Sequence, residues 1–138
     1  MALGLWVLAP AAALFPDQLS YFNEAACLPE HPGWISMAGG SRCGPLRLDD
    51  SNVDWGQGLG QLRDWLSVNG GGRKVKLGYF GSFPPGAYVA GAEAVDLSRE
   101  PGPGLYAISS HFVARTGWAL RRAPVAIVGH SFWIYEVK

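Results

Sequence analysis

The sequence predicts an α/β fold: a small, mainly parallel sheet with flanking helices, which also allows an antiparallel strand at one edge. Three observations predict it. Apolar residues recur at helical spacing from residue 55 to 66, short runs at 74–80 and 105–109 have the pattern of strands, and two further strand-like runs lie near the end, at 125–128 and 132–137. Strands and helices that alternate along a chain are typical of α/β proteins.

The composition excludes one class of function. The 138 residues have a formal net charge of zero, and the lysines and arginines are scattered along the chain. Nucleic-acid binding needs a basic stripe or patch, so nucleic acid is not an expected partner. The six tryptophans fit two interpretations, which are a small core filled with large rings and an interface that includes the membrane–water boundary.

Residues 1–15 are apolar and carry no charge. The run is shorter than the about 20 apolar residues of a transmembrane helix, and it lacks the positive segment of a signal peptide. Three interpretations stay open: the outer end of a membrane helix, a short anchor at the membrane surface, and a buried N-terminal helix. We favour the first, which divides the chain into a membrane-helix remnant (1–15) and a single soluble α/β domain (16–138).

The next part of the chain contains weak local signals. Pro16 and Asp17 suit the start of a short helix over residues 17–26, because proline and acids favour the first helical turn. Residues 28–44 contain several glycines and prolines without periodicity, which predicts a loop. Residues 46–48 are expected to form a short strand.

A helix is expected to follow the polar stretch 49–57. Ser51, Asn52 or Asp54 would cap it by accepting bonds from free backbone N–H groups. The glycines at 70–72 would end it. Its apolar stripe comprises Trp55, Leu59, Leu62 and Leu66.

The remaining elements follow from alternation and turn residues. Residues 74–80 and 105–109 are predicted strands, 88–95 is a short helix or an irregular segment, and 118–122 is one helical turn. Residues 125–128 and 132–137 can pair as a hairpin around Gly129.

The two cysteines leave alternatives open. Cys27 and Cys43 would form a disulfide outside the cytoplasm, or they are two part-buried thiols. A zinc site that adds His31 is disfavoured, because the sequence has no CxxC spacing and no second histidine nearby. No metal is predicted.

The chemical motifs in the chain are incomplete. Residues 50–54 are similar to the start of a calcium-binding EF-hand loop, but Trp55 and Gln61 occupy its glycine and glutamate positions. Residues 56–60 lack the third glycine of the dinucleotide fingerprint, and no cofactor is expected. A catalytic triad of Ser131, His111 and Asp50 is not favoured by spacing over ordinary polar side chains.

Several motifs in order resemble one family. They are Leu19-Ser20-Tyr21-Phe22-Asn23-Glu24, the stretch from Asp50 to Gln57, Leu62 with Trp65-Leu66, Val75-Lys76-Leu77-Gly78-Tyr79-Phe80-Gly81, Gly104-Leu105-Tyr106-Ala107-Ile108-Ser109, Trp118-Ala119-Leu120-Arg121-Arg122, Pro124-Val125-Ala126 and Gly129-His130-Ser131-Phe132-Trp133-Ile134-Tyr135. Together they resemble the C-terminal soluble region of bacterial membrane glycosyltransferases of the protein-O-mannosyltransferase and aminoarabinose-transferase-like group. The resemblance covers nearly the whole chain. It departs from the family at Gly58, where relatives tend to carry an acid, and in the Cys27–Cys43 loop.

The resemblance implies an accessory role. Such enzymes transfer a sugar from a polyprenyl-phosphate carrier, and their essential acid lies in an early extracytoplasmic loop between membrane helices. This chain is then expected to lie on the periplasmic side of the membrane, without a catalytic residue of its own. Its expected partners are the transmembrane region of the enzyme, the membrane surface, and a lipid-linked sugar or an acceptor.

The candidate ligand-binding residues lie where strands end and helices begin, because α/β sheets commonly bind ligands there. The alternative function is a stand-alone binding module or small hydrolase that uses the same crevice. The candidate residues are Asp50, Asn52, Asp54, Gln57, Tyr79 and Tyr106.

Overall fold

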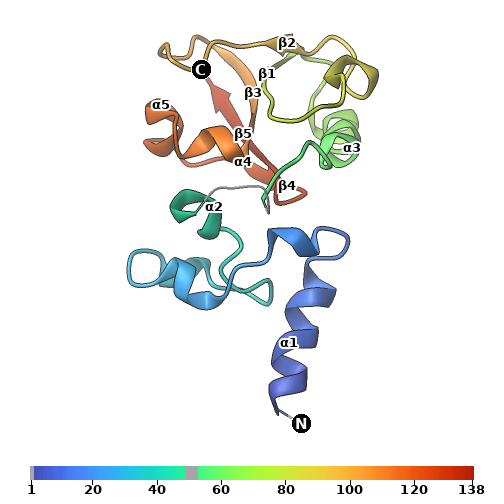
Figure 1. The fold of residues 1–138 in the computed structure, drawn as a ribbon. Helices are drawn as coiled ribbons and strands as arrows, with labels where there is room; N and C mark the ends of the chain where they lie inside the picture. The colour runs from blue at the N-terminus through green and yellow to red at the C-terminus, as the bar shows by residue number, and fades with distance from the viewer. Residues whose placement is uncertain (1, 49–52) are drawn as a thin grey trace.

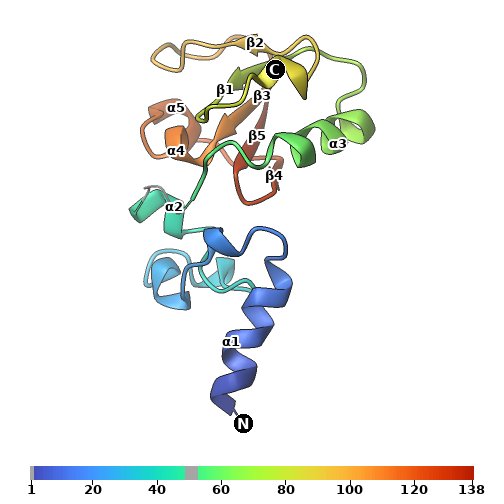
Figure 2. The same ribbon diagram turned by 45° about the vertical axis from the view of Figure 1, so that its right-hand side comes forward.

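The computed structural model describes residues 2–48 and 53–138. Residues 53–138 form a body around one sheet, residues 14–48 form a smaller N-terminal segment beside it, and the helix α1 (Ala2–Ala13) projects from that segment (Figures 1 and 2). The predicted candidates Asp50 and Asn52 lie outside the described residues.

The sheet has five strands in the order β2-β1-β3-β5-β4. β1 pairs in parallel with β2 and β3, whereas β5 pairs in antiparallel with β3 and β4. The α/β class is therefore correct, but the sheet is mixed and not mainly parallel, because the C-terminal hairpin places β5 in the interior of the sheet. The strands are β1 (Val75–Gly78), β2 (Glu93–Ala94), β3 (Gly104–Ser109), β4 (Ala126–Val128) and β5 (Phe132–Val137).

One face of the sheet packs against α3 (Leu59–Asn69). Leu59 and Leu62 are buried there against strand residues, as the apolar periodicity predicts. The helix ends at the predicted glycines, and Gly71 has a φ of +61°. Its start differs from the prediction, since the N-cap is Gly58, which has no side chain to accept a bond from the first backbone N–H groups. Trp55 therefore precedes the helix and is 51% exposed.

The other face packs against α4 (Ser110–Val113) and α5 (Gly117–Leu120). α5 confirms the helical turn predicted at 118–122, whereas α4 has no counterpart in the prediction. Trp118 meets Tyr106 and Tyr135 edge-on, at ring-centroid distances of 5.3 and 5.5 Å. The strict alternation of β5 between the two cores explains the pattern seen in the sequence.

The N-terminal segment differs most from the prediction. In place of one helix over 17–26, it has the 3₁₀ turns η1 (Gln18–Ser20) and η2 (Glu24–Cys27). The Asn23 side chain accepts a bond from the Ala25 backbone N–H and so starts a separate turn. Residues 46–48 are not a strand either, because Pro45 lies in the first turn of α2 (Gly44–Arg47). The remaining 3₁₀ turns are η3 (Pro32–Trp34) and η4 (Pro85–Ala87).

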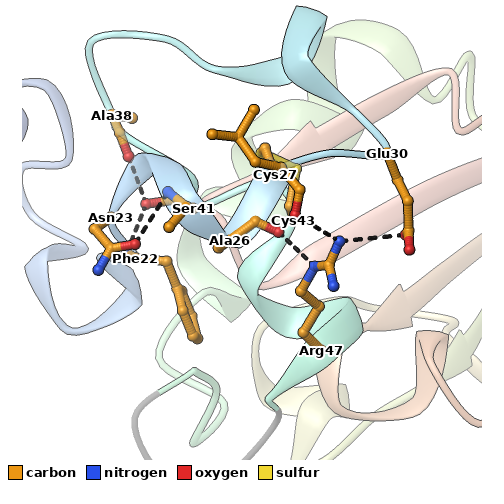
Figure 3. Close-up of a disulfide and its surroundings, with 11 residues drawn as sticks. Phe22, Asn23, Ala26, Cys27, Glu30, Ala38, Ser41, Cys43 and Arg47 are labelled. Carbon is orange, nitrogen blue, oxygen red and sulfur yellow. Dashed lines mark hydrogen bonds and ion pairs between the residues drawn. A yellow bond between two sulfur atoms is a disulfide. The ribbon is translucent and has the colours of Figure 1, made fainter.

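A disulfide joins Cys27 to Cys43 across this segment (Figure 3). The structure thus has the disulfide, one of the alternatives that the sequence leaves open, and both of its cysteines are buried. Arg47 extends the link: its Nε donates to the Ala26 carbonyl at 2.6 Å, its Nη2 donates to the Leu28 carbonyl at 3.1 Å, and the same nitrogen pairs with Glu30 at 3.3 Å. The bridge and these bonds together hold η2 against α2.

Candidate functional site

Asp54 lies at the carboxyl end of β3 and is 1% exposed. One carboxylate oxygen accepts the Gly56 backbone N–H at 2.8 Å, and the other accepts the hydroxyl of Ser109, the last residue of β3. A buried carboxylate needs such partners, because an unpaired one is strongly destabilising. Asp54 therefore fixes the 53–57 turn to the sheet, and it does not cap α3 as the sequence suggested.

Gln57 also belongs to this turn, but its bonds are local. Its Oε1 accepts the Trp55 backbone N–H at 2.6 Å, and its Nε2 donates to the Val53 carbonyl at 3.3 Å. Both bonds stay within its own loop. This arrangement favours a structural role for Gln57 over ligand binding.

Tyr79 follows β1 and covers the same turn. A Cβ at Gly56, which has a φ of +85°, would come within 2.0 Å of the Tyr79 hydroxyl oxygen, so only glycine fits there. The ring stacks on Phe132 at a centroid distance of 6.3 Å. The hydroxyl is buried, and no group in the described part of the chain reaches hydrogen-bonding geometry with it. Burial raises the pKa of Tyr79, against a smaller opposing effect of the Phe83 backbone.

Tyr106 does not join this group. It belongs to the core on the opposite face of the sheet, near the start of β3. Its hydroxyl donates to the Gly102 carbonyl at 2.8 Å and accepts from Lys76 Nζ at 3.1 Å. The structure thus brings together Asp54, Gln57 and Tyr79 and leaves Tyr106 elsewhere, because alternate residues of a strand face opposite ways.

Two features at this end of the sheet were not predicted. The first is a ring cluster in which Phe80 stacks on His111 at 4.0 Å and meets Trp55 at 6.1 Å. The second is a cavity of about 530 Å³ beside β1 and β2. The positions of aromatic residues after β1 and β3 in the sequence were the available signal for the cluster. The cavity is lined by Leu77, Gly78, Tyr79, Pro85, Ala92, Ala94, Val95, Asp96, Leu97 and Phe112.

The lining of this cavity offers little for acid–base catalysis. Asp96 is its charged lining residue, and two bonds from Ser98 hold the pKa of that carboxyl below its ordinary value. An ion pair with Arg99 at 3.1 Å also occupies Asp96. A carboxyl group so arranged stays ionised and is a poor general acid.

The triad and metal hypotheses find no support in the geometry. Ser131 is fully buried and its hydroxyl donates to the Gly129 carbonyl at 3.0 Å, while the His111 ring stacks on Phe80. Asp50, the third member, lies outside the described residues. Across residues 2–48 and 53–138, no three His, Cys, Asp or Glu side chains gather in a way that would hold a metal ion.

The outer surface of α1 is the most unusual part of the molecule. The large apolar side chains of its residues 4–13 are more than half exposed, and none of the helix residues is charged. Both views show the helix pointing away from the sheet, with the N-terminus at its far end (Figures 1 and 2). No helix in the described part of the chain is long and apolar enough to cross a membrane. The exposed side chains are Leu5, Trp6, Val7 and Leu8, followed by Phe15 and Leu19 just beyond the helix.

Comparisons of the chain with protein-family models, with curated proteins and with solved structures find no match.

Proposed function

We propose that this chain is an extracytoplasmic accessory domain of a polyprenyl-phosphate-sugar-dependent membrane glycosyltransferase, held at the bilayer by α1. The exposed apolar surface of α1 carries the proposal. Exposed apolar patches of this kind mark membrane or protein interaction sites, since burial of apolar surface is favourable. A helix that is apolar on all sides, with no charged face, suits the hydrocarbon region more than the headgroup plane.

The disulfide supports the location. Such bonds persist in oxidising compartments and are rare in the cytoplasm. Cys27 and Cys43 therefore suggest an oxidising, extracytoplasmic site for the domain.

The order of the motifs supports the enzyme class. The family resemblance given above extends from residue 19 to residue 135 in sequence order. The partner would be the transmembrane region of the enzyme, which would supply the catalytic acid. The domain would then position the carrier or the acceptor and take no part in bond breaking.

The membrane part of this proposal is tested by sedimentation with vesicles. The full chain should pellet with vesicles of phosphatidylcholine, a zwitterionic lipid that offers an apolar phase without a net negative charge. The double variant Leu5→Gln/Leu8→Gln should stay in the supernatant, because it removes two large exposed apolar side chains. Val68→Gln is the matched control, since Val68 is 81% exposed on α3, and it should pellet like the unmodified chain. Equal behaviour of all three proteins would contradict the proposal.

The enzyme class is tested separately by the genomic reading frame upstream. Hydrophobic spans in that frame, with an acidic residue in the first loop between them, would support the assignment. Unrelated genes upstream would refute it.

A stand-alone binding module is the second candidate, and the cavity of about 530 Å³ favours it. The local bonds of Gln57 and the structural bonds of Asp54 count against a hydrolase in the neighbouring crevice. A chain that stays monomeric and free of vesicles in the sedimentation experiment would favour this second candidate.

A further inference from the structure

A groove separates the N-terminal segment from the sheet body. It consists of two adjoining cavities of about 480 and 450 Å³, which share Trp34, Arg42 and Pro124 in their walls. One cavity extends along β4, and the other extends over α5 and the residues that follow it. Each cavity is within the usual size range of small-molecule sites, which is about 300–1,000 Å³.

Among residues 2–48 and 53–138, the side chains that line the groove include basic ones and no acidic one. The chain as a whole has a formal net charge of zero, so this is a local excess of positive charge. Arg121 is paired with Glu100, but Arg42 and Arg122 have no ion pair within residues 2–48 and 53–138. The basic residues are His31, Arg42, Arg121, Arg122 and His130.

Aromatic rings hold one arginine in place. The guanidinium of Arg42 lies over the Trp34 ring at 4.3 Å, and the His31 ring stacks on the same indole at 4.4 Å. Stacking uses the face of a guanidinium and leaves the N–H groups at its edge available for planar acceptors. Arg42 is thus oriented before any ligand arrives, which lowers the entropy lost on binding.

The backbone of the β4–β5 turn presents His130 to the groove. His130 has a φ of +52°, in the left-handed region that non-glycine residues rarely adopt. The turn is closed by a bond from the Ser131 N–H to the Val128 carbonyl at 3.2 Å. Backbone strain of this kind tends to gather at binding sites. Burial lowers the pKa of His130, although Asp17 opposes this, so at neutral pH the ring offers a neutral N–H donor.

We propose that this groove binds a phosphate group, with Arg42 and Arg122 as its cationic ligands and with His130 in the wall of the adjoining cavity, which Arg42 also lines. Arginine matches phosphate oxygens through two parallel N–H bonds, and its charge is independent of pH in the ordinary range. The phosphate has two sources, an anionic lipid headgroup and a soluble phosphorylated compound. β4 and α5, which contribute residues to the groove, lie in both views on the side of the N-terminal segment that is opposite to the free end of α1 (Figures 1 and 2).

Calorimetric titration of the full chain with inorganic pyrophosphate at low salt tests the site. Arg42→Gln and Arg122→Gln should each weaken binding at least fivefold, and Arg42→Lys should weaken it less. Arg63→Gln is the matched control, because Arg63 is exposed on α3, on the other face of the sheet, and should change affinity less than twofold. An unchanged melting temperature confirms that each variant is folded.

A second arm identifies the source of the phosphate. In the Leu5→Gln/Leu8→Gln background, vesicles with and without phosphatidylglycerol report headgroup binding independently of α1. If the protein binds pyrophosphate but not the vesicles, the phosphate comes from a soluble compound. If it binds the phosphatidylglycerol vesicles and Arg122→Gln removes that binding, the phosphate comes from a lipid headgroup. The proposal is overturned if neither ligand binds, or if Arg63→Gln weakens binding as much as Arg122→Gln. Because this arm lacks the apolar surface of α1, its result is separate from that of the proposed membrane function.

Discussion

Single residues at the carboxyl end of β3 show how the sheet fixes a polar loop. Asp54 is buried, and the Ser109 hydroxyl and the Gly56 N–H both donate to its carboxylate. The carboxylate was expected to serve a helix cap or a ligand. It instead accepts hydrogen bonds from backbone and hydroxyl groups that the fold has buried. A buried polar group without a partner would lower the stability of the folded state.

We predict that Ser109→Ala lowers the free energy of unfolding by about 1–3 kcal/mol, because it removes a donor from a buried carboxylate. Urea unfolding followed by circular dichroism measures the change. Ser98→Ala is the control: its hydroxyl also donates to a carboxylate, but that of the exposed Asp96, and its effect should stay within about 0.5 kcal/mol. Equal effects would show that the Ser109 bond contributes no more than an exposed one.

His130 makes stability depend on pH. Burial lowers its pKa in the folded state, so the unfolded chain binds more protons and stability falls as pH drops through the ordinary histidine value of about 6.5. His130→Asn removes this titration and tolerates the left-handed φ better. The variant should therefore lose less stability than the unmodified protein between pH 7.5 and pH 5.

Urea midpoints at the two pH values measure this. All other titrating groups are shared by the two proteins, so the difference between their pH slopes isolates His130. Identical slopes would contradict the assignment.

Elements with a strong period were predictable, and short irregular ones were not. α3, β1, β3 and the β4–β5 hairpin follow from the apolar patterns of the sequence: α3 buries one face, whereas β3 and β5 contribute to the cores on both faces of the sheet. The N-terminal segment has only short turns, and its geometry depends on the disulfide and on Arg47. The helix propensity of a short segment predicts its structure poorly where tertiary contacts determine the backbone conformation.

We predict that Cys27→Ala/Cys43→Ala destabilises the chain by about 3 kcal/mol, since the bridge closes a short loop, with a sequence separation of 16. Thermal unfolding with and without a reducing agent measures the loss. The reducing agent should lower the melting temperature of the unmodified protein and leave that of the double variant unchanged. A double variant that is as stable as the oxidised protein would show that the bridge adds nothing to folding.

At the scale of the whole molecule, α1 adds surface and little to the core. Pro10 in the helix and Leu14 just after it are buried. The Trp6 indole N–H donates one hydrogen bond to the Glu24 carboxylate at the surface. The helix is therefore placed to meet an external apolar phase and not to hold the sheet together.

We predict that deletion of residues 2–8 changes the free energy of unfolding by less than about 1 kcal/mol, because the deleted side chains that the structure describes are exposed. Chemical unfolding measures the change, and the same protein should no longer pellet with phosphatidylcholine vesicles. A loss of several kcal/mol would show that α1 is part of the folded core.

Local periodicity and hydrophobicity were enough to predict the α/β class, the amphipathic helix, the strands β1, β3, β4 and β5, and the apolar character of residues 1–15. β2 (Glu93–Ala94) was missed, since it lies in the segment 88–95 that was predicted as a short helix or an irregular segment. The tertiary structure alone decided which polar side chains meet. It placed Tyr106 on the opposite face from Tyr79, buried Asp54 beneath Ser109, and brought Arg42 and Arg122 to one groove from distant parts of the chain. The physical reason is that a groove or a buried hydrogen bond depends on how elements pack against one another. The spacing of two residues along the sequence does not determine the distance between them in the folded chain.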